Sequence, residues 1–452
     1  MAITYRQYPT SPNMANNNLV YEVTSDKSQQ PQYQFVMDIY TSGSANSIQR
    51  IKQQHNPSLK GVFDIGQIMV QYLGDDLPFT TAGFTTSSFT MGGFEVRMGE
   101  EYGTSTSSSV LLYNGIAPVT GSPAKVADEY YWNANGLVDY PNAVNFNFNS
   151  GSYLTMESAS ANITFDYQHT LTNGPTTQNI NDGEYLTTAL FNGNFMDPTS
   201  DVIAQDIFYV QINWYNSAGS QIQNDNFYNI ESNGGAPRVN VNDLWSTVAG
   251  DQTAGSRLLH IGLGPQNLTD FGITPPDWAY YIVTITAQDD AGQENNDGVW
   301  ATLRFNKSTG NCAYNGVRFA WKNEFGVWDY YTFGLQSDSA TGIERQAYEQ
   351  SFVDFSTSTN SVPYDKQRRG QSQFYNALTT RKTANSDWLS QADADWLKEL
   401  FFSPNVYIQN GLVFEPVVIG STELVEKTNP RTQKNFQYRI EFQPANQPRP
   451  RQ

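Results

Sequence analysis

The stretch VRFAWKNEFGVWDYYTFGL, residues Val317–Leu335, places aromatic side chains on both sides of a short loop that contains a glycine. The segments that flank the loop KNEFG read as the two strands of a hairpin, because glycine accepts the positive φ of a tight turn. In the second strand, Trp328 and Tyr330 share one face. Tyr331 and Phe333 share the opposite face. The pattern therefore predicts a hairpin that is covered on both faces.

Three interpretations of this hairpin are open: a platform for stacking sugars, a hairpin of the core, and part of a surface that docks other subunits. A sugar platform would leave one face exposed with a polar rim, so the core and the interface are favoured. In either case Trp321, Trp328 and Tyr331 are predicted to anchor the fold or an interface. The tip is expected to stay exposed, and its side chains are candidate contacts with a partner: Lys322, Asn323 and Glu324.

The composition indicates a protein rich in β-structure. Aromatic residues make up 14% of the 452 residues and charged residues only 15%, a balance that favours strands over helices. Aromatic side chains suit pleated surfaces, and the abundant Asn, Ser, Thr and Gly suit turns. We predict a mainly β fold of β-sandwich or jelly-roll-like domains, with a few short helices and extended arms. The length predicts several domains, which we place at residues 1–120, 121–340 and 341–452.

Two helices are predicted among the strands. Residues 64–74 carry apolar side chains at helical spacing behind Asp64, which predicts a short helix in the N-terminal domain. The clearest helix follows Ser390, and Asp393 stands where a capping box places its acidic partner. Trp396 lies on the apolar side of this helix and is the fourth predicted anchor of the fold or an interface.

Two polar segments, residues 1–18 and 341–380, are predicted to be extended arms. The second contains the basic run KQRRG, whose side chains are further candidate contacts with a partner: Lys366, Arg368 and Arg369. The net charge of −18 divides into −19 for residues 1–340 and +1 for residues 341–452, which suggests two surfaces that face different neighbours. So acidic a chain is not expected to bind nucleic acid sequence-specifically, because that binding neutralises phosphates with Lys and Arg.

Motifs for catalysis are missing from the sequence. It has no Gly-rich phosphate loop, no HExxH, no CxxC and no Ser nucleophile elbow. Its three histidines are more than ninety residues apart, and its one cysteine excludes an intrachain disulfide. We therefore predict a protein that is not an enzyme and uses no cofactor. A glycosidase stays open as an alternative, because it needs only two carboxylates that the fold brings together.

The best metal candidate is the acidic loop QDDAGQENNDG, residues 288–298. Its possible ligands are Asp289, Asp290, Glu294 and Asp297. Calcium prefers such hard oxygen ligands, but the spacing is not that of an EF-hand, and a solvated loop is the simpler interpretation. No apolar run approaches the roughly 20 residues of a membrane span, and no signal-peptide pattern opens the chain.

Several segments share a pattern with one group of proteins. The hairpin reads W-x-N-x-x-G-x-W-D-x-Y-x-F from Trp321 to Phe333. The C-terminal part adds a Trp-Leu helix followed by SPNVYI (Ser403–Ile408) and PVVI (Pro416–Ile419). The opening adds NNNLVYEV, YQFVMDIY, VFDIGQIM and RMGEEYG. Together these segments resemble virion structural proteins of tailed bacteriophages, particularly crAss-like and related Bacteroidetes phages, although much of residues 140–270 is unmatched.

The resemblance implies a non-enzymatic ring subunit of a phage tail or neck. Its partners would be further copies of itself and neighbouring tail or neck proteins, within a virion assembled in the host cytoplasm. Ring subunits make head-to-tail contacts that close by rotation, and the two predicted arms are candidates to cross them. The first alternative is a tail protein that binds a receptor or a glycan, and the second is a tail-associated glycan depolymerase.

Overall fold

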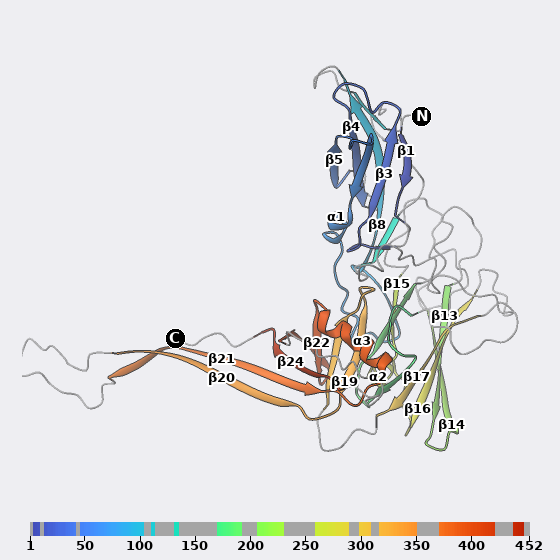
Figure 1. The fold of residues 1–452 in the computed structure, drawn as a ribbon. Helices are drawn as coiled ribbons and strands as arrows, with labels where there is room; N and C mark the ends of the chain where they lie inside the picture. The colour runs from blue at the N-terminus through green and yellow to red at the C-terminus, as the bar shows by residue number, and fades with distance from the viewer. Residues whose placement is uncertain are drawn as a thin grey trace, which may run out of the picture. The chain divides into compact units, whose positions relative to one another are not determined.

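The structure is a computed structural model that describes residues 3–9, 13–41, 46–103, 110–113, 131–134, 170–191, 206–229, 258–288, 298–308, 316–349, 370–420 and 437–446. Over these residues the protein is mainly β, with strands β1–β24 in several antiparallel sheets and three helices (Figure 1). The predicted fold class is confirmed. The basic run KQRRG, apart from its last residue, and the four candidate calcium ligands lie outside the described residues.

The chain divides into two compact units. Unit 1 comprises residues 1–308 together with 322–329, and unit 2 comprises residues 309–321 together with 330–452. The predicted domain boundaries at residues 120 and 340 do not coincide with these units. The hairpin of the opening stretch is divided between them, since its tip counts with unit 1 and most of its two strands with unit 2.

The N-terminal part of unit 1 contains two sheets. The first has the order β1-β3-β6, and the second has the order β2-β10-β8-β4-β5 with β9 also paired to β8. The strands of the first are β1 (Ile3–Gln7), β3 (Val20–Ser25) and β6 (Lys60–Asp64). The strands of the second are β2 (Asn13–Met14), β10 (Tyr131–Ala134), β8 (Met91–Tyr102), β4 (Gln34–Thr41), β5 (Gln49–Gln53) and β9 (Val110–Tyr113).

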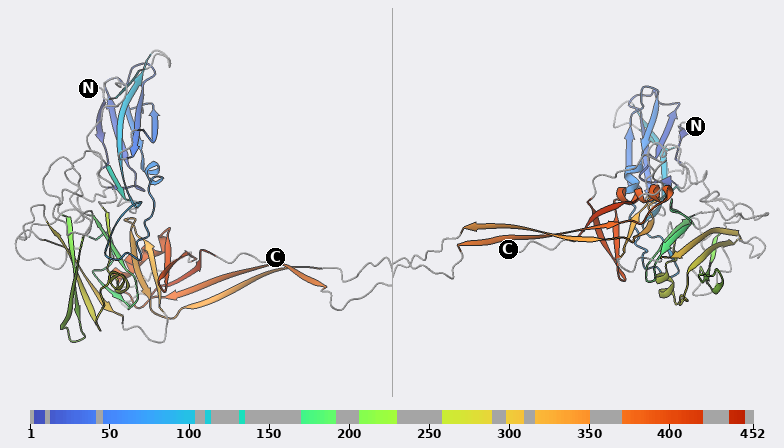
Figure 2. Two further views of the ribbon diagram at one scale, coloured as in Figure 1. Left: turned by 180° about the vertical axis from the view of Figure 1, so that it is seen from behind. Right: turned by 60° about the horizontal axis from the view of Figure 1, so that its bottom comes forward.

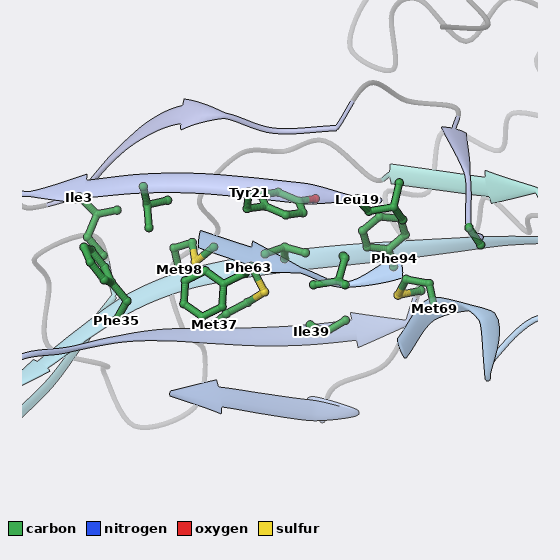
Figure 3. Close-up of a cluster of buried hydrophobic side chains, with 14 of the residues drawn as sticks. Ile3, Leu19, Tyr21, Phe35, Met37, Ile39, Phe63, Met69, Phe94 and Met98 are labelled. Carbon is green, nitrogen blue, oxygen red and sulfur yellow. The ribbon is translucent and has the colours of Figure 1, made fainter. Parts of the chain in front are cut away.

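A core of alternating side chains is shared by these two sheets. Tyr21 of β3, Phe35 and Met37 of β4, and Phe94 of β8 are all buried in it (Figure 3). Ile3 of β1 also packs into this cluster and is 5% exposed. The prediction that residues 1–18 form an extended arm is therefore wrong for the described part, because β1 pairs with β3 and contributes to the core.

The predicted N-terminal helix is α1 (Gly66–Val70), which is shorter than its apolar pattern suggested. Asp64 does not occupy the N-cap position, which belongs to Ile65. Its Oδ1 nevertheless accepts hydrogen bonds from the backbone N–H groups of Gly66 and Leu19, both 3.0 Å long. The carboxylate thus satisfies a donor of the first turn and joins the helix to the start of β3.

The remainder of unit 1 contains two further sheets and helix α2 (Pro265–Phe271). A five-stranded sheet has the order β11-β17-β16-β13-β14, with β11 (Thr177–Ile180), β17 (Gly298–Lys307), β16 (Tyr280–Gln288), β13 (Asp206–Tyr215) and β14 (Gln221–Tyr228). A three-stranded sheet has the order β12-β15-β7, with β12 (Thr187–Phe191), β15 (Leu258–Gly262) and β7 (Phe84–Thr86).

The side chain of Asn267, in α2, connects several of these segments. It is fully buried, donates hydrogen bonds to the carbonyls of Phe79 and Thr81, and accepts one from the N–H of Leu186. Sequence reasoning had not found α2, whose seven residues begin with a proline and carry no apolar repeat. The helix nevertheless has a proline in its first turn and the left-handed Gly272 at its end, and the tertiary hydrogen bonds of Asn267 hold it in the fold.

Unit 2 contains one seven-stranded sheet and helix α3 (Gln391–Phe402). The order is β19-β18-β22-β23-β24-β21-β20, with β19 (Trp328–Phe333), β18 (Val317–Lys322), β22 (Val406–Asn410), β23 (Val413–Ile419), β24 (Arg439–Pro444), β21 (Gln371–Asn385) and β20 (Asp338–Glu349). The predicted capping box of α3 is confirmed, because the Ser390 hydroxyl accepts from the N–H of Asp393 and the Asp393 carboxylate accepts from the N–H of Ser390. The buried side of α3 packs against β18, β22 and β24.

Candidate functional site

Three of the four predicted anchors meet in the core of unit 2. Trp321 at the end of β18 is fully buried, and its ring centroid lies 5.2 Å from that of Trp396 on α3. Tyr331 of β19 approaches the same Trp396 ring edge-on, with 6.2 Å between ring centroids. Burial raises the pKa of the Tyr331 hydroxyl, and the nearby carboxylates of Asp387 and Asp393 add to this effect. These aromatic side chains hold α3 against the sheet, with both Trp rings buried and Tyr331 partly buried.

The tip of the hairpin is engaged by other residues of unit 1. Lys322 makes an ion pair of 2.7 Å with Asp75, and its side chain is 10% exposed. Glu324 Oε1 accepts a hydrogen bond of 2.6 Å from the side-chain amide of Asn173. Two of the three partner contacts predicted at the hairpin tip therefore interact with the chain itself.

Asn323, between them, is a buried polar residue of the tip. Its side-chain amide donates to the carbonyl of Leu171 at 2.8 Å, and its Oδ1 accepts from the N–H groups of Phe325 and Val327. Asn323 is 4% exposed. The prediction of an exposed tip is wrong here, because residues about 150 positions earlier in the chain supply the partners that bury it.

Trp328, the fourth anchor, is fixed by the loop that follows α1. Its indole N–H donates a hydrogen bond of 2.6 Å to the carbonyl of Asp76, and its ring lies edge-on to Phe79 with 4.7 Å between centroids. The neighbouring Asp329 accepts a hydrogen bond of 2.8 Å from the Thr172 hydroxyl. The side chains of Trp328 and Asp329 are buried and thus use their polar atoms inside unit 1, as buried polar groups require.

The carboxylate of Asp76 organises the same loop. It accepts a hydrogen bond of 2.6 Å from the Ser87 hydroxyl and further ones from the N–H groups of residues 88–90. Burial alone would raise the pKa of Asp76, but these hydrogen bonds outweigh it and hold the pKa below its usual value. An ionised carboxylate at this position stabilises the loop that receives Trp328.

Of the two histidines among the described residues, His260 on β15 lies in a core. It is 1% exposed, and β15 pairs it with Thr85 of β7 and Ala189 of β12. Burial lowers the pKa of His260 to about 4, although the charge of Asp76 acts in the opposite direction. The imidazole is therefore neutral near pH 7, and its enclosure among strands makes it a packed side chain without access to a substrate.

The longest exposed element is a two-stranded antiparallel ribbon of unit 2. It consists of β20 and residues 371–381 of β21, and its strands run side by side in the views of Figures 1 and 2. All twelve residues of β20 are exposed. Beyond the ribbon, β21 pairs with β24 only from Lys382 to Asn385. Sequence reasoning interpreted the polar stretch 341–380 as an extended arm, and the described part of it forms this ribbon.

The ribbon displays apolar and charged side chains in an ordered pattern. Ile343 and Leu378 lie directly opposite each other, and they are 54% and 39% exposed. Strand β20 carries three carboxylates and one Arg, whereas β21 carries Arg381 and Lys382 and no acidic residue. The strands thus carry net charges of −2 and +2. The described residues include no group of three His, Cys, Asp or Glu side chains that could hold a metal ion.

An exposed aromatic side chain near α3 was not singled out from the sequence. Trp388, two residues before the Ser390 cap, is 65% exposed, while Trp396 of the helix is 4% exposed. Both lie in the same Trp-containing segment, SDWLSQADADWL, so composition does not separate them. The helical period distinguishes the two tryptophans, because Trp388 precedes the N-cap and lies outside the apolar repeat.

Comparison with known proteins adds little to this geometry. No family model matches the chain, and no curated protein matches it. One similar solved structure is the native conformation of alpha-2-macroglobulin of E. coli, at 9% identity and a TM-score of 0.18. The alignment covers 85% of this chain and 22% of that one, so the chain spans about a fifth of its length. A likeness this weak carries no argument. Among the described residues, no helix is long and apolar enough to cross a membrane.

Proposed function

We propose that the protein is a non-enzymatic structural subunit of a tailed-phage virion, which assembles as a homo-oligomeric ring in the tail or neck and docks neighbouring tail proteins. The exposed ribbon is the observation that carries this proposal. An isolated two-stranded ribbon is marginally stable in water, and its full length gains stability only when other surfaces pack against it. An element with every residue of β20 exposed therefore suits a contact with another subunit.

The remaining support comes from the hairpin and from the sequence. The aromatic side chains that suggested sugar stacking, Trp321 and Trp328, are 0% and 3% exposed and hold the fold together. The segments that resemble phage virion proteins include the strands and helix that build the core of unit 2. The acidic residues 1–340 and the near-neutral residues 341–452 give the subunit two surfaces of different charge.

Assembly is tested by light scattering behind size exclusion over a concentration series, followed by cryo-electron microscopy of the largest species. We expect discrete oligomers and class averages with rotational symmetry. Mass spectrometry of purified phage particles that encode the chain should find it as a virion component. A chain that stays monomeric at every concentration, and is missing from those particles, would overturn the proposal.

A further inference from the structure

The ribbon has two outer edges that can accept another strand. In the order of the seven-stranded sheet, β20 is the last strand, so among the described strands only β21 pairs with it. On the other side of the ribbon, β24 pairs with β21 only from Lys382 onward, which leaves the outer edge of residues 371–381 beyond its reach. Each edge is about 37 Å long, at roughly 3.4 Å per residue. Neither strand contains a proline.

Long exposed edges of this kind are templates for pairing with a further strand. Pairings with a second copy are of two kinds: between like edges, β20 with β20 or β21 with β21, and between unlike edges, β20 with the outer edge of β21. Charge separates them. A β20–β20 contact would oppose two strands of net charge −2, and a contact between two β21 edges would oppose two positive charges. A β20–β21 contact opposes −2 with the +1 of residues 371–381. Like charges directly across a strand pair are destabilising, and opposite charges stabilise it.

The two arrangements also differ in symmetry. A contact of β20 with β20 uses the same surface on both copies and ends at a dimer. A contact of β20 with β21 uses a different surface on each copy, so one edge of each kind stays free at the two ends of the assembly. Further copies can then add until rotation closes a ring. Because β20 and β21 run in opposite directions within a ribbon, ribbons that point the same way meet with their strands antiparallel.

We propose that β20 of one copy adds, antiparallel, to the outer edge of β21 residues 371–381 in a second copy of this chain, so that ribbons join head to tail into a continuous sheet. This inference rests on the homo-oligomeric part of the proposed function and names the surfaces that meet. The exposed pair Ile343 and Leu378 then lies on one face of that sheet, where neighbouring ribbons continue the apolar row.

A charge exchange within the ribbon tests this pairing. The variant Glu344→Lys with Glu349→Lys changes β20 from −2 to +2, so that both edges repel. We expect the concentration at half-assembly to rise about tenfold or more, which corresponds to the loss of favourable cross-strand charge pairs. Adding Arg381→Glu and Lys382→Glu turns residues 371–381 from +1 to −1, with a further negative charge beside them, and restores opposite charges, so assembly should recover.

The matched control reverses two exposed carboxylates outside the ribbon, Asp26→Lys with Asp277→Lys, and should assemble like the wild type. Deuterium exchange of the assembled wild type should slow in β20 and residues 371–381. Thermal melting checks that all variants fold. If the wild type assembles but the charge exchange has no effect, or the fourfold variant fails to recover, the edge pairing is overturned while the proposed function stands. A wild type that never assembles overturns the edge pairing, and if the chain is also missing from purified virions the proposed function is overturned as well.

Discussion

The indole N–H of Trp328 donates a hydrogen bond of 2.6 Å to the backbone carbonyl of Asp76, 252 residues earlier in the chain. The contact buries an aromatic ring in unit 1 and satisfies its one polar atom. The same loop presents Asp75 to Lys322 and Phe79 to the Trp328 ring. The loop that follows α1 therefore binds the tip of the hairpin.

Replacement of Trp328 by Phe should therefore destabilise unit 1. The variant keeps most of the aromatic packing but leaves the Asp76 carbonyl without its donor, which costs about 1–3 kcal/mol in the free energy of unfolding. The measurement is urea unfolding followed by far-ultraviolet circular dichroism. The control is Trp388→Phe, at a side chain that is 65% exposed, where the change should stay within about 0.5 kcal/mol. Equal effects in both variants would contradict the assigned role.

Asn323 gives a second test of the tip. Its side chain makes three hydrogen bonds in a buried position, so Asn323→Ala should lower the free energy of unfolding by about 2–3 kcal/mol. The neighbouring Glu324→Ala removes one exposed hydrogen bond and should cost about 0.5 kcal/mol or less. Were the tip an exposed partner-binding loop, as its sequence suggested, the two variants would be equally mild.

His260 predicts how stability depends on pH. Its pKa is about 4 in the folded protein and about 6.5 when unfolded, so the unfolded chain binds the proton first as pH falls. The stability from the neutral buried imidazole is full above pH 6.5 and is lost as pH falls toward 4, which amounts to about 2 kcal/mol between pH 7 and pH 5. The depressed pKa of Asp76 acts only at lower pH and leaves this window unaffected.

The measurement is a set of urea midpoints at pH 7 and pH 5. A His260→Gln variant should be less stable at pH 7 but lose most of the difference between the two pH values. The His55→Gln variant keeps the buried imidazole and should retain that difference. If the His260→Gln variant keeps the difference in urea midpoint between pH 7 and pH 5, that difference comes from groups other than His260.

The cap of α3 is tested by Ser390→Ala. Loss of the hydroxyl that accepts from the N–H of Asp393 should cost about 1 kcal/mol and increase deuterium exchange in the first turn of the helix. Ser390→Thr retains an acceptor at the same position and should exchange like the wild type. If both variants behave alike, the capping hydroxyl is unimportant to this helix.

The sequence predicted those features that local pattern specifies. The α3 capping box, the apolar repeat that carries Trp396, and the alternation of the hairpin strands each lie within a few residues of one another, so period and turn chemistry are enough to identify them. The mainly β class followed from composition. The ribbon was predicted only as an extended arm. Its strands bury neither face, so they lack the alternation of apolar and polar residues that identifies a strand in a sequence.

The features that were missed depend on distant partners. Asn323 is polar and sits in a turn, which suggests exposure, but Leu171 encloses it from about 150 residues away. Strand β1 is short and precedes a proline-containing stretch, yet Ile3 enters a core built by β3, β4 and β8. No local signal distinguishes such residues from solvated ones, since burial here is decided by tertiary packing.

The membership of residues 322–329 in unit 1 has a consequence for synthesis on the ribosome. The chain emerges from its N-terminus, so residues 1–308 are made before residues 322–329. These later residues bind Asp75, Asp76 and Leu171 in the folded unit. Until Trp328 has emerged, the loop after α1 lacks its contact with the indole ring, and the nascent unit 1 exposes apolar surface that includes Phe79. Unit 1 can therefore complete its folding only after residues 309–321, the first segment of unit 2, have been translated. The two units are then not folded strictly one after the other.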